Sequence, residues 1–336
     1  MAYPEPAAAV PARKENYLLQ IGILVVLLLA LLGVLIYFRA VPCNSVHPVV
    51  CDVYYSLVAG GKPKVLIVHG ESGMGNPEHL YDVLKSPHFS ARVALKDMQV
   101  VSLPVLMESQ IVIVERARVM GIEDLKMFED YVNRGGKLVW IGDAGTVAPD
   151  TESDLNYFLK YSERKSGGSP DYIGPWARKV GNKQLSFDYL LGVDYLADYC
   201  DTVKCSGDGS LVGHLDISGT DKELVNGISQ ALPFYGNFSI VKQNDSAYQS
   251  ALAYLDYGEN LIGTPSSENF WLKTERQGFG RTLPLIVSSG FGGRVAYYAF
   301  PPEYVVSEKM PIDKKTGERV AYWGIVENMY YGMLYK

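Results

Sequence analysis

Five side chains could do chemistry at one edge of a folded sheet: His69, Glu71, Glu115, Asp143 and Glu303. Two carboxyl groups on either side of a sugar are what glycoside hydrolysis requires, so Asp143 and Glu303 are the candidate catalytic pair. A histidine beside carboxylates could instead bind a metal ion or another ligand, which makes His69, Glu71, Glu115 and Asp143 binding candidates. The structural alternative is that such acids cap helix N-termini, as Asp143 could. We expect no resident metal and no cofactor.

The segment 110–145 has the pattern of one strand–helix–strand unit. Residues 111–114 are four consecutive β-branched residues, and such an apolar run suits a strand that is covered on both faces. Apolar residues then recur three and four apart through residues 122–132, which predicts a helix that two glycines can end. Residues 137–141 form a second apolar run. Because ligands of parallel sheets bind beyond the carboxyl ends of the strands, the carboxylates that follow these two runs should lie at one edge.

A similar apolar run, residues 64–68, opens the folded domain and leads into a glycine-rich loop, HGESGMG. The glycines invite a phosphate-binding interpretation. However, the loop lacks both the G-x-x-x-x-G-K-[ST] pattern and the spacing of a dinucleotide fingerprint, so nucleotide binding is not expected. Residues 77–85 are predicted to form the first helix of the domain and residues 99–103 its second strand.

The composition is that of a globular protein with an additional apolar segment. Of the 336 residues, 48% are hydrophobic and 20% are charged, and the net charge is −6. This charge gives no attraction to nucleic acid, so no nucleic-acid partner is expected. The length suits one large domain or two ordinary domains.

Residues 17–38, from Tyr17 to Phe38, contain no charged side chain and are long enough to cross the hydrocarbon core of a lipid bilayer. Aromatic residues at both ends suit the membrane interfaces. A cleaved signal peptide is the competing interpretation, but its apolar core is usually about 7–15 residues long and ends at a small-x-small site. We therefore expect an uncleaved single-pass anchor, with residues 1–16 as a tail and residues 39–61 as a membrane-proximal linker.

Basic residues near the span bear on its orientation. Arg13 and Lys14 precede the span, whereas Arg39 alone follows it closely. Because cytoplasmic flanks carry the excess of Lys and Arg, this small bias favours a cytoplasmic N-terminus and an extracytoplasmic C-terminal domain.

The cysteines and two glycosylation motifs agree with export. The chain has four cysteines in two local pairs, Cys43 with Cys51 and Cys200 with Cys205. Such pairs suit two short-loop disulfides in an oxidising compartment, whereas the paired C-x2-C spacing of zinc sites is absent. N-x-[ST] motifs at Asn237 and Asn244 predict glycosylation, which matters only on an exported domain.

The folded domain is expected to span residues 62–336. Residues 162–220 lack clear periodicity and are rich in Gly, Ser, Asp and Tyr, so an irregular insertion is expected there. Three strand patterns follow the insertion, the last two separated by a glycine-rich hairpin turn: residues 251–255, 283–288 and 294–300. An apolar stripe through residues 319–334 predicts a closing helix that packs on the sheet.

Four segments, in this order, resemble the class I glutamine-amidotransferase-like family: KVLIVHG, QIVIVERA, YVNRGGKLVWIGDAG and GRVAYYAFPPE. The resemblance is to the divergent members that include trehalose-utilisation-type proteins and a related domain of an oligosaccharyltransferase subunit. It covers residues 62–303, interrupted by the insertion. It implies an α/β fold, namely a flavodoxin-like three-layer sandwich with a mainly parallel sheet.

The resemblance also implies that catalytic groups are missing from this chain. In active members the strand that matches residues 137–141 leads into a sharp turn with a nucleophilic cysteine, and Asp143 stands at that position. A cysteine works there because it is partly thiolate near neutral pH, and an aspartate cannot replace it. The family's His-x-Glu pair falls at Pro301 and Glu303, so only the carboxylate is matched.

Three hypotheses for function follow. The leading one is a non-catalytic, membrane-anchored, extracytoplasmic binding or structural subunit of a membrane or cell-surface protein complex. The second is a membrane-tethered hydrolase that acts on glycans or amides through its carboxylates. The third is a carbohydrate-binding module in which aromatic residues of the insertion stack on a glycan: Tyr172, Trp176, Tyr189 and Tyr195.

Overall fold

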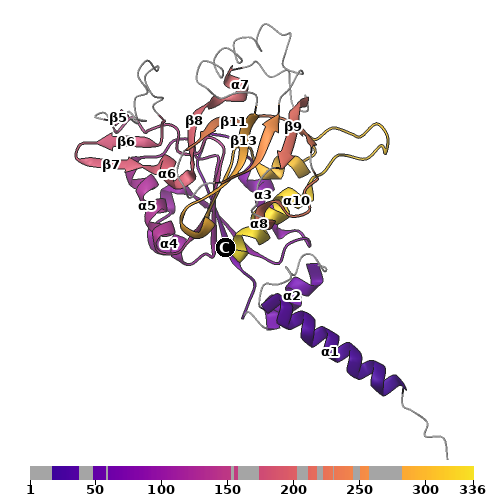
Figure 1. Cartoon of the computed structure of the whole chain (residues 1–336). Coiled ribbons are helices and arrows are strands. Elements are labelled where there is room, and N and C mark those ends of the chain that lie inside the picture. Colours follow the sequence, from indigo (N-terminus) through magenta and orange to yellow (C-terminus); the bar gives the residue numbers. More distant parts are fainter. Residues whose placement is uncertain are drawn as a thin grey trace, which may run out of the picture.

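The computed structural model describes residues 17–37, 48–57, 60–152, 155–157, 174–202, 211–217, 222–229, 231–244, 250–256 and 282–336. Within these residues the domain is built on one nine-stranded sheet, with the strand order β10-β9-β12-β13-β14-β4-β3-β1-β2 (Figure 1). Five neighbouring strands are parallel: β2 (Arg92–Asp97), β1 (Lys64–His69), β3 (Ile111–Glu115), β4 (Lys137–Ile141) and β14 (Val295–Tyr298). The others pair antiparallel: β13 (Thr282–Ser289), β12 (Ser250–Asp256), β9 (Leu211–Ile217) and β10 (Leu232–Tyr235).

The expected strand–helix–strand unit is present as β3, α5 (Ile122–Asn133) and β4. Every residue of β3 is buried, which agrees with its continuous apolar run. The prediction of an α/β fold is confirmed. The prediction of a mainly parallel sheet holds for the half that carries the candidate site. The sheet as a whole is mixed because the turn at Gly290 sends β13 into β14 as an antiparallel hairpin.

Helices cover both faces of the sheet, so the domain has three layers (Figure 1). On one face lie α4 (Leu103–Met107), α5 and α6 (Phe187–Leu191), and on the other lie α3 (Pro77–Lys85), α8 (Lys222–Val225) and α10 (Trp323–Glu327). Trp140 of β4 packs its ring against Phe128 of α5 and Phe187 of α6, with ring centroids 5.3 and 4.8 Å away. These contacts bury large aromatic area and fix α5 and α6 on the sheet.

The closing helix begins at Trp323, later than predicted, and continues through a π-helical turn (Asn328–Gly332) into α11 (Met333–Tyr335). Val326, Met329 and Met333, which belong to the predicted stripe, are fully buried. The segment is therefore buried within the domain, whereas its packing on the sheet stays a prediction.

The second strand was wrongly placed by the sequence pattern. It is β2, at Arg92–Asp97, and Met98–Val100 form a 3-10 turn instead. Because β2 is the edge strand and pairs only with β1, its residues are half-buried or exposed and show no apolar run.

The expectation of an irregular insertion at residues 162–220 is wrong for the part that the structure describes. Four short strands and two helices fill much of it, and β9 belongs to the main sheet. The additional elements are β6 (Ala177–Val180), β7 (Lys183–Ser186), β8 (Val193–Asp198) and α7 (Tyr199–Thr202). β6 pairs with β5 (Leu155–Tyr157) and β7, and β8 pairs with β11 (Ser239–Gln243). These strands mix polar with apolar residues, so none shows the continuous apolar run by which β1, β3 and β4 were recognised.

The N-terminal segment forms the apolar helix α1 (Tyr17–Tyr37), as predicted. Its window Gln20–Tyr37 has a mean hydropathy of 2.7, so the helix is long and apolar enough to cross a membrane, a test that a signal sequence also passes. Part of the expected linker is a second helix, α2 (Pro48–Leu57), in which Cys51 is buried. Residues 1–16 and Phe38 lie outside the described residues.

Candidate functional site

A sharp turn follows β4 at the carboxyl edge of the parallel strands. Gly142 and Gly145 adopt left-handed conformations, with φ of 59° and 66°. A Cβ at Gly145 would lie 2.9 Å from Leu125, and one at Gly142 would lie 3.1 Å from Met74. The two glycines therefore let the chain turn tightly against its neighbours and place Asp143 at the tip.

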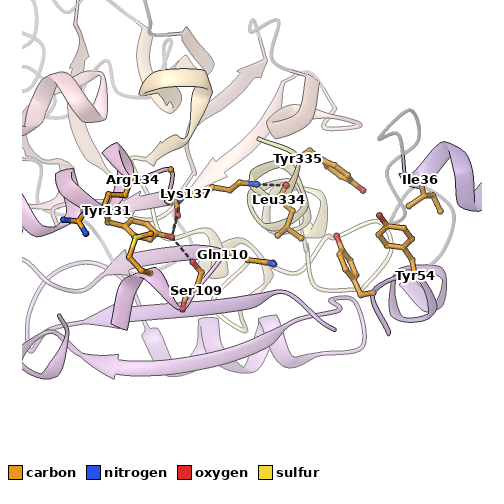
Figure 2. Close-up of a pocket in the computed structure, with 13 residues that line it drawn as sticks. Ile36, Tyr54, Ser109, Gln110, Tyr131, Arg134, Lys137, Leu334 and Tyr335 are labelled. Carbon is orange, nitrogen blue, oxygen red and sulfur yellow. Dashed lines mark hydrogen bonds between the residues drawn. The ribbon is translucent and has the colours of Figure 1, made fainter. Parts of the chain in front are cut away.

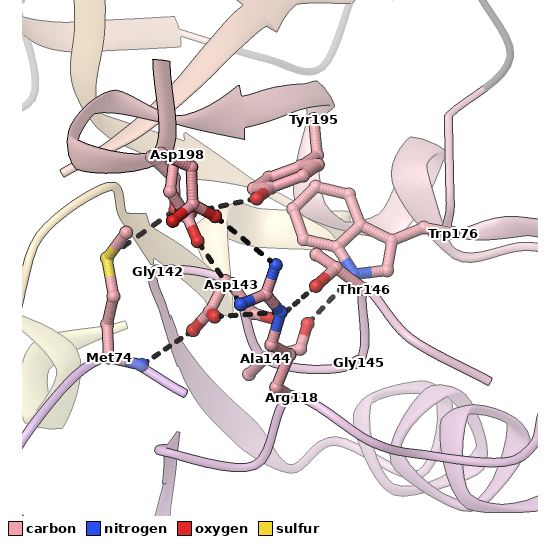
Figure 3. Close-up of polar contacts among 12 residues, drawn as sticks. Met74, Arg118, Gly142, Asp143, Ala144, Gly145, Thr146, Trp176, Tyr195 and Asp198 are labelled. Atoms are coloured by element: carbon pink, nitrogen blue, oxygen red, sulfur yellow. Dashed lines mark hydrogen bonds and ion pairs between the residues drawn. The ribbon is translucent and has the colours of Figure 1, made fainter. Parts of the chain in front are cut away.

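The Asp143 side chain is only 1% exposed, and both of its carboxylate oxygens are engaged. Oδ1 accepts a hydrogen bond of 2.7 Å from the Met74 amide, and Oδ2 lies 3.4 Å from Nε of Arg118 (Figure 3). Burial raises the pKa of Asp143, while the Met74 amide and the charge of Arg118 oppose that rise. Asp143 is thus held by the loops after β1 and β3.

Arg118 is the centre of a network that reaches a second buried acid. Its guanidinium lies 3.7 Å from Oδ2 of Asp198 and 3.6 Å from Oδ2 of Asp201. Asp198 also accepts hydrogen bonds from the Tyr195 hydroxyl (2.8 Å) and the Ser239 hydroxyl (3.3 Å). Burial, with the nearby charge of Asp143, raises the pKa of Asp198 to about 6. Arginine supplies the positive charge here, and no cluster suited to a metal ion occurs among the described residues.

A second pair of acids, Glu115 and Glu303, lies elsewhere at the same edge. Their side chains are 0% and 2% exposed, and Oε1 of Glu303 accepts a 2.9 Å hydrogen bond from the Asn76 amide. Both carboxylate oxygens of Glu115, and Oε2 of Glu303, are buried without a hydrogen-bond partner among the described residues. Burial and then the charge of Glu303 raise the pKa of Glu115 well above its usual range, and burial raises that of Glu303 to about 7. At neutral pH the pair therefore keeps at least one proton.

The loop after β1 keeps the two groups of acids apart. Its Met74 amide binds Asp143, and its Asn76 amide binds Glu303. Gly75 between them has φ of 107°, and a Cβ there would lie 2.7 Å from Oε2 of Glu115. Backbone amides of one loop therefore bind both Asp143 and Glu303, and no hydrogen bond joins the two carboxylates among the described residues.

The other two binding candidates do not join either group. His69 is half-buried, with Nδ1 3.3 Å from the Gly70 carbonyl oxygen, and Glu71 is exposed. Sequence reasoning instead missed Arg118 and Asp198. Arg118 could have been noticed as a basic residue three positions after β3. Asp198 could not, because β8 was not recognised as a strand.

Two further side chains seal the turn after β4 from the side of β6. Nε1 of Trp176 donates a 2.9 Å hydrogen bond to the Ala144 carbonyl (Figure 3). Nη2 of Arg178 donates one of 2.6 Å to the Gly145 carbonyl. Both side chains are fully buried. The prediction that Trp176 stacks on a glycan is therefore wrong.

The remaining aromatic candidates divide. Tyr195 is buried and bound to Asp198, so it is also unsuited to stacking on a sugar. Tyr189 is exposed, and Tyr172 lies outside the described residues.

Each predicted disulfide has only one of its two cysteines among the described residues. Neither Cys51 nor Cys200 is a free thiol, but Cys43 and Cys205 lie outside the described residues, so the pairing stays a prediction.

Both glycosylation motifs sit in packed surroundings. Asn244 is 7% exposed, and its Nδ2 donates a 3.0 Å hydrogen bond to the Asp188 carbonyl, which leaves no room for a glycan. Asn237 is half-buried, its Oδ1 accepts from the Cys200 amide, and Ser239 of its motif is fully buried. In this structure the side chain of Asn244 is therefore not accessible for glycosylation, and that of Asn237 is only partly accessible.

Comparison with protein families finds no match, and comparison with curated proteins finds no relative. Among solved structures, a putative ThuA-like protein from Bacteroides uniformis ATCC 8492 is 12% identical, with 81% of this chain and 91% of that chain covered and a TM-score of 0.47. A putative GMP synthase protein from Thermoplasma acidophilum is 8% identical, with 81% and 92% covered and a TM-score of 0.40. The β-galactosidase from Bacillus circulans sp. alkalophilus is 15% identical, with 71% and 28% covered and a TM-score of 0.40. Similarity at this level carries no statement about chemistry, and the amidotransferase-like resemblance stays a prediction.

Proposed function

We propose that this chain is a non-catalytic, membrane-anchored protein whose α/β domain lies outside the cytoplasm and serves as a binding or structural subunit of a membrane or cell-surface complex. The observation that carries the proposal is the state of Asp143. It occupies the turn where the related enzymes would carry a nucleophile, yet it is 1% exposed and both of its oxygens are engaged. A carboxylate in that state is not available to attack a substrate or to exchange a proton with one.

The polar groups around Asp143 support a structural role for this edge of the sheet. Through the Met74 amide and Arg118, Asp143 links the loops that follow β1 and β3. Arg118 extends the link to Asp198 at the end of β8. A buried network of this kind fixes one arrangement of the loops, because breaking any member leaves a buried charge without its partner.

The hydrolase hypothesis lacks a supporting observation. It requires Asp143 and Glu303 to face one substrate, but each accepts a backbone amide of the loop after β1 and each is almost fully buried. The carbohydrate-binding hypothesis retains only Tyr189 as an exposed aromatic among its described candidates.

Two features support the membrane anchor and the exported domain. The side chains of α1 are largely exposed along the helix, as expected of a segment that faces lipid. The absence of a free thiol at Cys51 and Cys200 agrees with an oxidising compartment.

The test is isolation of the full-length chain, with a C-terminal tag, from its native membranes after extraction in mild detergent. We expect a stable complex with other proteins, measured as a defined mass in solution. The Asp143→Asn variant tests whether the ionised carboxyl group of Asp143 is needed for this role, and it should recover the same partners as the parent. A tagged single-pass protein of unrelated sequence controls for capture by detergent micelles. A strictly monomeric chain, both in crosslinked membranes and in detergent, would contradict the proposal.

The side of the membrane is tested separately. Protease added to intact cells should digest the domain but leave α1 and the preceding tail protected. Digestion that occurs only after the cells are opened would place the domain in the cytoplasm.

A further inference from the structure

A cavity of about 450 Å³ lies at the opposite end of the domain from Asp143, next to the end of α1 (Figure 2). Four parts of the chain that are far apart in sequence form its walls. Ile36 comes from the last turn of α1, Tyr54 from α2, Lys137 from the start of β4 and Tyr335 from the C-terminal helix. The cavity therefore joins the predicted membrane span to the folded domain.

The charged side chains that line this cavity are both positive. They are Arg134, which follows α5, and Lys137, and no acidic residue is among the lining residues. Lys137 donates a 2.6 Å hydrogen bond from Nζ to the Leu334 carbonyl (Figure 2). Arg134 is exposed at the rim, and its guanidinium makes no hydrogen bond or ion pair with any described residue. In a chain with a net charge of −6, a cavity with two positive charges and no negative one is suited to an anion.

The position and the other walls of the cavity indicate which anion. Ile36 is 3% exposed, whereas Tyr37 beside it is 63% exposed. The cavity is thus level with the end of α1, and where α1 spans a bilayer this is the depth of the lipid headgroups. Tyrosine rings with a hydroxyl at one end are favoured at that depth, as are Lys and Arg side chains, which place their charge at the interface. The walls combine aromatic and aliphatic surface with hydrogen-bond donors, which suits an amphiphile.

We propose that this cavity binds the headgroup of an anionic phospholipid. The phosphate would lie near Lys137, and the glycerol end of the lipid would lie against Ile36 and Tyr54. The guanidinium of Arg134 points away from Lys137 and adds positive charge at the rim (Figure 2). The inference deepens the proposed function, because it rests on α1 being a membrane span. It adds that the folded domain recognises the lipid and is held against the membrane surface by it.

The experiment uses the full-length protein in a neutral detergent, with phosphatidylglycerol or phosphatidylcholine of identical acyl chains added back. Native mass spectrometry counts the lipid molecules that each sample retains. We expect the parent to retain phosphatidylglycerol in preference to phosphatidylcholine. Arg134→Gln and Lys137→Gln should each lower phosphatidylglycerol retention about fivefold, the effect of losing one charge at an anionic membrane surface. Arg134→Lys, which keeps the charge, should retain most of it.

Lys179→Gln is the matched control, because Lys179 is an exposed basic residue of β6, far from the cavity (Figure 1). It should leave lipid retention unchanged. Equal retention of the two lipids by the parent would overturn the inference, as would undiminished phosphatidylglycerol retention in the Arg134→Gln, Lys137→Gln double variant. Thermal stabilisation by inorganic phosphate as large as that by phosphatidylglycerol would identify a site for free phosphate and overturn the lipid assignment.

Failure of the proposed anchor is seen separately. A chain that alkaline carbonate releases from native membranes lacks the anchor, whatever lipid it retains in detergent.

Discussion

The buried pair Glu115 and Glu303 makes a specific prediction about stability and pH. Burial raises the pKa of both carboxyl groups, and the charge of Glu303 raises that of Glu115 further. An acid whose pKa is higher in the folded chain than in the unfolded chain stabilises the fold most below its unfolded pKa, here 4.5. That stabilisation is lost as the pH rises through the folded value. The parent protein should therefore become less stable between about pH 5 and pH 8.

The magnitude follows from the pKa of Glu303, which rises from 4.5 to about 7. At about 1.4 kcal/mol for each pKa unit, ionising the pair at high pH lowers the free energy of unfolding by about 3 kcal/mol. For a domain of this size, that corresponds to a fall of roughly 6–12 °C in Tm. Glu303→Gln removes the group whose raised pKa of about 7 sets this pH window. The variant should therefore lose little of its stability over the same range.

The assay is thermal unfolding of the full-length protein in detergent at pH 5, 6, 7 and 8. Intrinsic fluorescence is suitable, because Trp140 and Trp176 are fully buried and report loss of the core. Glu71→Gln is the control, since Glu71 is an exposed carboxylate near the same loop and its removal should leave the pH profile of the parent. A Glu303→Gln variant with the same loss of Tm as the parent between pH 5 and pH 8 would refute the assignment of this loss to Glu303.

Three other predictions concern the turn after β4 and the anchor. Asp143→Ala removes the partner of Arg118 and the acceptor of the Met74 amide, so it should lower the free energy of unfolding in denaturant by about 3 kcal/mol. Asp143→Asn keeps an acceptor for the Met74 amide and should therefore lose less stability. Equal losses in the two variants would contradict the role of that hydrogen bond. Gly145→Ala places a Cβ 2.9 Å from a Leu125 methyl group, at a φ of 66°, and should lower the stability measured by thermal unfolding by about 2–3 kcal/mol. Gly317→Ala is the control, because Gly317 has a similar φ of 71° but no atom within 4 Å of the added Cβ; it should lower the stability by about 1 kcal/mol. Native membranes washed with alkaline carbonate should keep the chain in the pellet through α1, and its appearance in the soluble fraction would mean that α1 is no anchor.

Prediction from sequence succeeded where a local pattern is sufficient. β3, α5 and β4 were placed within a residue or two, because apolar runs and helical periodicity are properties of neighbouring residues. β2 was missed because an edge strand buries only part of its surface and needs no apolar run. The short strands β6, β7 and β8 were missed because their sequences mix polar with apolar residues and show no continuous apolar run.

The sequence by itself determined the apolar helix α1 and the parallel strands of the central unit. Each of these depends on the kind and spacing of nearby residues. Only the tertiary structure decided that Asp143 pairs with Arg118 and that Glu115 lies beside Glu303, which is 188 residues further along the chain. Side chains that far apart in the chain meet only when the loops at the sheet edge are folded. The course of the loop after β1 decides which of its backbone amides binds each carboxylate.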